Sequence, residues 1–304
     1  MVIMQHVPAW TDRGTAVLTG NADFSWNVSR DTWEEGEKRD DVFVALLDNF
    51  GALEVKWNNE KAPFDDPRVR RAVHLAINRH QAVDVYREET NIVSRWMSKG
   101  GEGSTPDDVL FQTPGYKREN ADDIAEAQRL LAEAGYPNGE GLRSFKLVSA
   151  SVPGHAEVLA PFFAEQLSSN LGIDVDISVV ERALVSEEYK KDFDLVLSTI
   201  FHSPVKNHTP LWQVVWTTGA SQNFGKYSNP EFDAIVEQLN GELDPMKRAD
   251  LFRKGEEALD ANPPQYHFGF TAHMPMWRDY VKGLQLEKRV QTEWGRFETV
   301  WLDR

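Results

Sequence analysis

One stretch of the chain alternates between strand and helix patterns in an order that few folds accept. Residues 145–149 form an apolar run typical of a buried strand, and residues 173–180 form another. Between them, residues 155–171 have helical spacing and end before a glycine. Pro161, inside this helical segment, predicts a kink or a late helix start. A strand, a crossover helix and a strand of this length predict a right-handed parallel βαβ unit, and therefore an α/β fold.

Composition narrows the class of protein and of partner. The 304 residues are 41% hydrophobic and 27% charged, as in a globular protein with room for about two domains. The net charge of −15, without any basic stripe, argues against a nucleic acid as partner. Cysteine is absent, which removes disulfides and thiolate metal sites. No apolar run approaches the ~20 residues that span a bilayer, and residues 1–6 do not resemble a signal peptide.

Residues 63–79 predict a turn that leads into a helix. Asp66 can accept hydrogen bonds from the first helical amides, and Pro67 suits the first helical position. Val69 and Val73 fall on one face of this helix, and the arginines are expected on the other face. The segment therefore combines a capped start with an amphipathic body.

Other local patterns predict elements along the rest of the chain. Residues 2–7 predict a short strand, and residues 10–19 predict a helix that ends at Gly20. Asn229 and Asp244 are each followed by proline, and both are expected to cap the start of a helix.

The wording of residues 63–79 is PFDDPRVRRAVHLAINR, and six weaker patterns accompany it in sequence order. These are residues 18–23, 55–58, 127–139, 227–233, 281–283 and 297–303. Together they resemble the family 5 extracellular solute-binding proteins, the oligopeptide and dipeptide receptors of ABC importers. The resemblance covers nearly the whole chain. It implies a periplasmic-binding-protein-like (type II) α/β fold, in which two lobes are joined by two crossing strands.

Under this resemblance the chain has three parts. Residues 1–53 correspond to a partial first lobe, residues 54–270 to a nearly complete second lobe, and residues 271–304 to a C-terminal return to the first lobe. The hinge is expected on the two crossing strands. The expected hinge residues are Val55, Asn58 and Phe268.

The function that the resemblance implies is binding and not catalysis. The chain would be the substrate-binding component of an ABC importer, which captures a peptide-like or other small solute between its lobes and delivers it to the permease subunits in the membrane. The expected location of the full-length protein is periplasmic or extracellular. No cofactor is expected.

Two alternatives remain open at this stage. Some relatives bind oligosaccharides, and tryptophans could stack on sugar rings. A glycoside-type hydrolase is the second alternative, because carboxylate pairs are plentiful in an acidic chain. The chain has no Gly-x-Ser-x-Gly, HExxH, P-loop or GxGxxG motif, so other enzyme classes find no support.

The predicted ligand contacts come from two stretches. One follows the predicted strand at residues 193–199, because open α/β sheets bind ligands where strands end. The other follows the first-lobe pattern at residues 18–23, at positions that the family turns toward ligand. The predicted ligand-binding residues are Trp26, Asn27, Phe201, His202, Ser203, Asn207, His208, Trp212 and Trp216.

The resemblance also brings one departure from the family. Peptide-binding members carry a Trp and then an Asp in the stretch that follows residues 193–199, and that Asp pairs with the α-amino group of the peptide. Here these positions read Ile200 or Phe201, and Ser203 or Pro204. An ammonium group buried without a counter-charge is costly, which weighs against a plain peptide ligand.

Histidine spacing raises the question of a metal site. His202 and His208 are six residues apart, as are His267 and His273, and six residues keep one face of a strand. A site would need more ligands that converge, so no metal ion is predicted.

Overall fold

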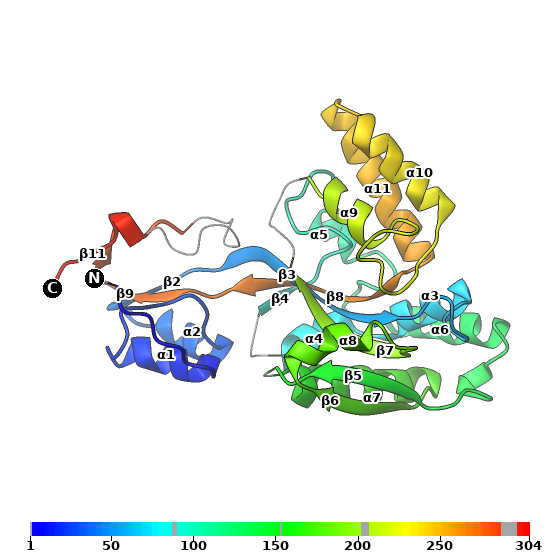
Figure 1. The fold of residues 1–304 in the computed structure, drawn as a ribbon, viewed down its shortest axis with the longest axis horizontal. Helices are drawn as coiled ribbons and strands as arrows, with labels where there is room; N and C mark the ends of the chain where they lie inside the picture. Colours follow the sequence, from blue (N-terminus) through cyan, green and yellow to red (C-terminus); the bar gives the residue numbers. More distant parts are fainter. Residues whose placement is uncertain (1, 87–89, 153, 202–206, 287–296) are drawn as a thin grey trace.

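The computed structural model describes residues 2–86, 90–152, 154–201, 207–286 and 297–304. They form two bodies side by side (Figure 1). The large body is built from described residues between 47 and 273, and the small body from residues 2–46, 274–286 and 297–304. Two strands of the large body, β3 (Leu47–Trp57) and β8 (Gln265–His273), lead into the small body at one end. The predicted part boundaries, at 53/54 and 270/271, fall inside these two strands.

The large body is organised around a six-stranded mixed sheet of order β4-β8-β3-β7-β5-β6. β5 pairs in parallel with both β6 and β7, while β3 is antiparallel to its neighbours β7 and β8. The predicted parallel βαβ unit and the α/β fold class are therefore confirmed. The bounds of the other strands are β4 Thr90–Ile92, β5 Phe145–Ala150, β6 Val175–Val180 and β7 Leu195–Phe201.

The crossover helix of the βαβ unit begins with a wide turn. A π-helical turn, η2 (His155–Leu159), precedes α7 (Ala160–Leu171), so Pro161 lies in the first turn of the regular helix. This confirms the predicted late start. Gly172 ends α7 at φ +67°, and a Cβ there would lie 2.2 Å from the Asn138 carbonyl oxygen, so this position requires glycine.

Helix α3 (Pro67–Ala76) starts as predicted, since the Asp66 side chain accepts a 2.8 Å hydrogen bond from the Arg68 amide. The prediction for the arginines is confirmed for Arg68, which is exposed, and is wrong for Arg70, which is only 4% exposed. Its guanidinium donates to the carbonyl oxygens of Phe64 and Pro263. The helix packs against α6 and α7 on one side and α11 on another, so little of its surface reaches solvent.

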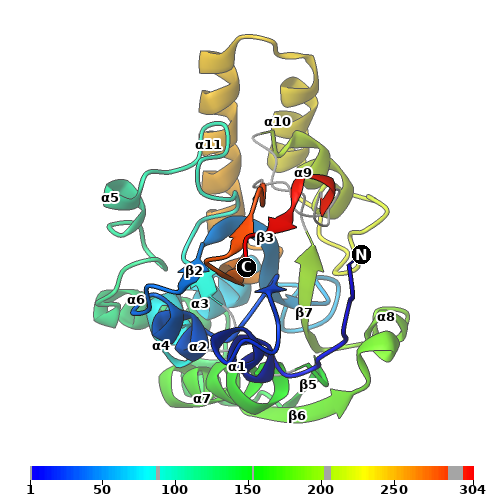
Figure 2. The same cartoon turned by 90° about the vertical axis from the view of Figure 1, so that its left-hand side faces the viewer.

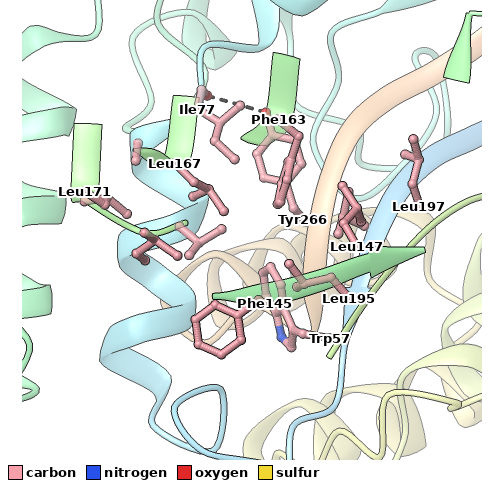
Figure 3. Packing of buried hydrophobic residues seen from close by; sticks show 14 of the residues in the cluster. Trp57, Ile77, Phe145, Leu147, Phe163, Leu167, Leu171, Leu195, Leu197 and Tyr266 are labelled. Atoms are coloured by element: carbon pink, nitrogen blue, oxygen red, sulfur yellow. Dashed lines mark hydrogen bonds between the residues drawn. The ribbon is translucent and has the colours of Figure 1, made fainter. Parts of the chain in front are cut away.

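Both faces of the central strands are covered. On one face, α3, α6 (Ala121–Glu133) and α7 enclose a core in which Trp57, Phe145 and Tyr266 are fully or almost fully buried (Figure 3). On the other face lie α9 (Thr209–Val215) and the hairpin of α10 (Pro230–Gly241) and α11 (Pro245–Ala261), which projects from the body (Figure 2). Asn229 and Asp244 cap α10 and α11, as predicted.

The small body has a three-stranded sheet of order β1-β9-β2, with β1 at Phe24–Ser25, β9 at Met276–Arg278 and β2 at Val42–Val44. Helices α1 (Trp10–Leu18) and α2 (Arg30–Gly36) lie together on one side of it (Figure 1). The helix predicted at residues 10–19 is confirmed as α1. The predicted strand at residues 2–7 is wrong: among the described residues, no strand pairs with this segment.

The remaining elements are short. They are α4 Arg79–Val85, α5 Asp107–Leu110, η1 Pro137–Gly139, η3 Arg182–Leu184, α8 Val185–Glu188, β10 Val281–Lys282, η4 Phe297–Thr299 and β11 Trp301–Leu302. β10 and β11 pair with each other. Across the described ranges, none of the helices has both the length and the apolar composition that a bilayer crossing requires.

Candidate functional site

The register of the large sheet places four strand ends on the side of the small body. β3 runs from Leu47, next to the small body, to Trp57. β7 and β8 are antiparallel to β3, so both run toward the small body. β5 is parallel to β7, and β6 is parallel to β5, so these two strands run in the same direction. The carboxyl ends of β5, β6, β7 and β8 therefore meet at one edge, which is where α/β sheets usually bind ligands. We call this edge the junction edge. It is formed by the last residues of the four strands, which are Ala150, Val180, Phe201 and His273.

The two strands that lead from the junction edge into the small body, β3 and β8, are not hydrogen-bonded evenly along their length. Gly51 of β3 is paired on both sides, with Phe201 of β7 and Thr271 of β8. The next pair outward joins Leu47 to His273, so four residues of β3 stand against two of β8. This shift of register is a bulge, and it interrupts the ladder at the passage between the bodies.

The two predicted contacts in the small body have different surroundings. Asn27 is 6% exposed, and its side-chain oxygen accepts a 2.8 Å hydrogen bond from the Met274 amide, which fixes β1 to the end of β8. Trp26 is only partly buried, and its ring meets Phe24 edge-on with 5.1 Å between the ring centres. Of the two side chains, only that of Trp26 is accessible enough to contact a ligand.

Asn207 and His208 connect α9 to neighbouring segments. The Asn207 side-chain oxygen accepts from the Thr209 amide at 2.9 Å and from Arg248 at 3.0 Å. His208 is 1% exposed, and its Nε2 lies 3.2 Å from the Ser98 amide nitrogen. Because an amide can only donate, Nε2 is the acceptor in this hydrogen bond. Both side chains position the start of α9.

Trp212 and Trp216 lie inside the helical layer. Trp212 is 0% exposed and packs between Phe232 and Phe252, and Trp216 is 2% exposed. Trp96 lies edge-on to Trp216, with 5.4 Å between the ring centres. In this conformation neither indole presents a face on which a ligand could stack.

The remaining predicted contacts lie at the end of β7. Phe201 is its last residue, and its backbone stands at the junction edge opposite Gly51. His202 and Ser203 lie outside the described residues, as does Pro204.

The predicted hinge residues lie away from the bulge between Leu47 and Gly51, although Phe268 falls at a second shift of register, between Leu53 and Glu54 of β3. Val55 is buried in the middle of β3, between Leu197 and Tyr266, and Phe268 is buried in β8. Asn58 follows the far end of β3, where its side-chain oxygen accepts from the Glu60 amide at 3.1 Å. All three residues therefore belong to the large body. Asn58 lies at the end of β3 that is farther from the small body.

Two histidines at the junction edge were not among the predicted contacts. His155 follows β5 and is 3% exposed, and His273 ends β8. Burial lowers the pKa of each side chain to about 4. His155 could have been found from the sequence, because it comes soon after the end of the strand predicted at residues 145–149.

Acidification is expected to reduce the free energy of unfolding between about pH 6.5 and pH 4. His155 has a pKa of about 4 in the folded protein against 6.5 in the unfolded chain, so its stabilising contribution is complete above pH 6.5 and is lost as the pH falls to 4. Glu256 acts in the opposite sense, because burial raises its pKa to about 7. Urea unfolding at a series of pH values should show a shallower decline for His155→Gln than for the parent chain.

The matched control is His6→Gln, which changes an exposed histidine. It should leave the pH dependence as it is in the parent chain. An unchanged slope in His155→Gln would contradict the assignment of this decline to the buried imidazole.

Metal binding gains no support from the described side chains. In the ranges that the structure describes, no three His, Asp or Glu side chains lie close enough together to hold a metal ion.

Comparison with known proteins agrees with this geometry. The sequence model of the bacterial extracellular solute-binding proteins, family 5 (middle), matches residues 1–222. The periplasmic oligopeptide-binding protein OppA of Salmonella typhimurium is 26% identical over an alignment of 250 residues, which covers 76% of this chain and 44% of OppA.

Solved structures show the same fold. The periplasmic binding protein DppA of Helicobacter pylori, in complex with the peptide STSA, has a TM-score of 0.77 at 21% identity and covers 98% of this chain. The oligopeptide-binding protein AppA of Bacillus subtilis, in complex with a nonapeptide, has a TM-score of 0.78 at 18% identity and also covers 98%. The predicted two-lobe binding-protein fold class is thereby confirmed.

The matches cover this chain far more completely than they cover the relatives. The chain spans 44% of OppA, 56% of DppA and 59% of AppA, so it has about half the length of the proteins that it matches. The family match nevertheless includes most of its residues. The chain belongs to the bacterial extracellular solute-binding proteins of family 5.

Proposed function

We propose that this chain contributes most of one lobe, and part of the other, to the solute-binding component of an ABC importer. The observation that carries the proposal is the convergence of four strand ends on an edge that faces a second body, with only β3 and β8 leading across. This arrangement suits a receptor that encloses its ligand between two bodies. The solute would be released to permease subunits in the membrane, from the periplasm or the outer surface of the cell.

A peptide-like solute is the best-supported ligand class. The relatives named above are oligopeptide-binding or were solved with a peptide bound. The oligosaccharide alternative gains no support from them, and it also loses Trp212 and Trp216 as stacking surfaces because both are buried. The glycoside-hydrolase alternative gains none either, since the family is one of binding proteins.

We place the pivot between the bodies at the bulge between Leu47 and Gly51, and not at Val55, Asn58 and Phe268. From Gly51 to Lys56, β3 is paired with both β7 and β8, with one further shift of register between Leu53 and Glu54, so bending there would break ladder hydrogen bonds on both sides. Toward the small body, the ladder continues only through Leu47 and His273. Closure would then move residues 2–46 and the segment after His273 as one unit against the large sheet.

Native mass spectrometry of the protein, purified from its own cells without refolding, tests the proposed function. The expected result is a retained ligand whose mass corresponds to one or several peptides and which is released on denaturation. Retention of a sugar, or conversion of offered oligosaccharides to products, would contradict the proposal.

Trp26→Ala is expected to weaken peptide binding by about tenfold, because one aromatic contact of about 1–1.5 kcal/mol is removed. Its unfolding midpoint should change little, since the ring is only partly buried. Isothermal titration calorimetry gives the affinity for a peptide that native mass spectrometry has identified as a ligand. Trp10→Ala, which alters a partly buried tryptophan of α1 on the same body, is the matched control and should bind as the parent does.

A further inference from the structure

The segment that follows β4 has no helix or strand of its own. It comprises residues 93–105, which we call the strap. β4 pairs with Phe270–Ala272 of β8, so the strap begins beside a strand that leads into the small body. Trp96 is 0% exposed, and the amide of Ser98 donates to Nε2 of His208 at the start of α9. Because no ladder or helix holds it, the strap can open while the core stays folded.

Two buried carboxylates of α11 face the strap. Glu256 is 1% exposed and Asp260 is 5% exposed, and a spacing of four residues places them on one face of the helix. Arg95 of the strap lies 2.7 Å from Asp260 but 3.8 Å from Glu256. Farther along the strap, Glu102 accepts a 2.9 Å hydrogen bond from Arg248 of α11. Arg95 is thus shared by two buried carboxylates and lies closer to Asp260.

Glu256 also has two uncharged partners. The Trp96 amide donates to its Oε1 at 3.1 Å, and the Thr105 hydroxyl donates to its Oε2 at 2.7 Å. A protonated carboxyl group keeps both hydrogen bonds, because it accepts from the amide and can donate to the hydroxyl. Loss of the proton places a second negative charge beside Asp260 and away from water. Burial, the largest cause, raises the pKa of Glu256 to about 7.

From this geometry we infer that Glu256 is a proton switch for the strap: with a proton bound it fastens residues 93–105 to α11, and without the proton the strap opens more often. When the strap opens, Glu256 meets water, and its pKa is expected to return to the ordinary value of 4.5. The fastened state therefore binds the proton more tightly. Fastening is strongest below about pH 4.5 and weakens until the pH reaches about 7.

The strap joins the end of β8 to the start of α9, so the switch controls a contact beside the junction edge. It acts within the large body. It does not depend on the proposed function or on the identity of the solute.

Two histidines also contact the strap. His74 of α3 and His267 of β8 both stack on the Trp96 ring, with 5.9 and 5.7 Å between the ring centres. Burial lowers the pKa of His74 well below its usual value, so acid acts on this group in the opposite sense. Both histidines remain in a variant at Glu256. The comparison of that variant with the parent chain therefore isolates the proton on Glu256.

Hydrogen–deuterium exchange of the Glu256→Gln variant tests the inference. Glutamine has the shape of the protonated acid and can keep both hydrogen bonds, but it does not titrate. The exchange rate of the strap amides, divided by the intrinsic rate at each pH, gives the opening equilibrium. Relative to the variant, opening in the parent chain should increase about 40-fold from pH 5 to pH 7. Glu257→Gln, which alters the exposed neighbour on α11, is the matched control and should follow the parent.

A ratio of parent to Glu256→Gln that does not change with pH would overturn the inference. So would an equal change at the amides of β5, because Glu256 would then stabilise the whole fold and not the strap in particular. Carbon-13 NMR of the parent chain gives a second measurement that needs no variant. The Glu256 carboxyl group should titrate with a midpoint of about 7, and a midpoint near 4.5 would contradict the switch.

Discussion

Asp260→Ala is expected to lower the free energy of unfolding by about 3–5 kcal/mol, because it removes one partner of a buried ion pair. Asp260 is 5% exposed, and Arg95 donates to it at 2.7 Å. The indole N–H of Trp96 and the hydroxyl of Tyr116 donate to its other oxygen at 2.7 and 2.9 Å. Without the carboxylate, the buried donors of Trp96 and Tyr116 lose their acceptor, and the largely buried guanidinium of Arg95 keeps only its more distant contacts with Glu256 and Thr105.

Urea unfolding followed by circular dichroism measures this loss. The matched control is Asp250→Ala on the same helix, whose exposed carboxylate pairs with Lys254 at 2.9 Å. This variant should unfold close to the parent, because exposed ion pairs contribute little. A similar loss in both variants would show that the helix, and not the buried pair, determines the effect.

Trp212→Ala is expected to cost about 3–5 kcal/mol of unfolding free energy, since it leaves a cavity in the helical layer. The ring is fully buried, and a Cβ added at Gly255 would lie 2.3 Å from it, so α11 packs directly against the indole. Peptide affinity, measured where the variant is still folded, should equal that of the parent. This outcome separates a core residue from the ligand contact that its sequence context predicted.

Trp301→Ala is the comparison for this substitution. Its indole is 55% exposed on β11, so its loss should shift the unfolding midpoint only slightly. If Trp212→Ala left stability unchanged and abolished binding, the structural role assigned to Trp212 would be wrong.

Local patterns predicted the parts of the fold that local forces determine. The cap at Asp66 and the late start of α7 at Pro161 depend on backbone chemistry within a few residues, and both are confirmed. The parallel strands around α7 follow from chain length and handedness, and are confirmed as well. Such features need no knowledge of what packs on the segment.

Features that depend on distant partners could not be predicted in this way. Arg70 has the sequence position of a solvent-facing residue, yet it donates to the carbonyl of Pro263, 193 residues away. Trp212 and His208 lie in a loop-like, proline-containing context, yet helices α10 and α11 and the segment near Ser98 bury them. A hydrophobic or polar pattern gives the side of an element and not the identity of its neighbour.

The candidate site shows the same limit. The sequence indicated a ligand edge after β7, and the register brings the ends of β5 and β8 to that edge too. It did not indicate which aromatic side chains stay accessible, because that depends on the helical layer above the sheet. Trp26 is partly exposed while Trp212 is buried, although both are tryptophans that follow a strand.

Measuring the distance between the two bodies shows whether they close when a peptide binds. The chain has no cysteine, so Thr15→Cys on α1 and Ser186→Cys on α8 would carry the only two spin labels. Double electron–electron resonance would be recorded with and without a mixture of oligopeptides. We expect a shorter distance, and a narrower distribution, when peptide is present. An unchanged distribution at a peptide concentration that saturates calorimetric binding would contradict closure of the two bodies on a solute.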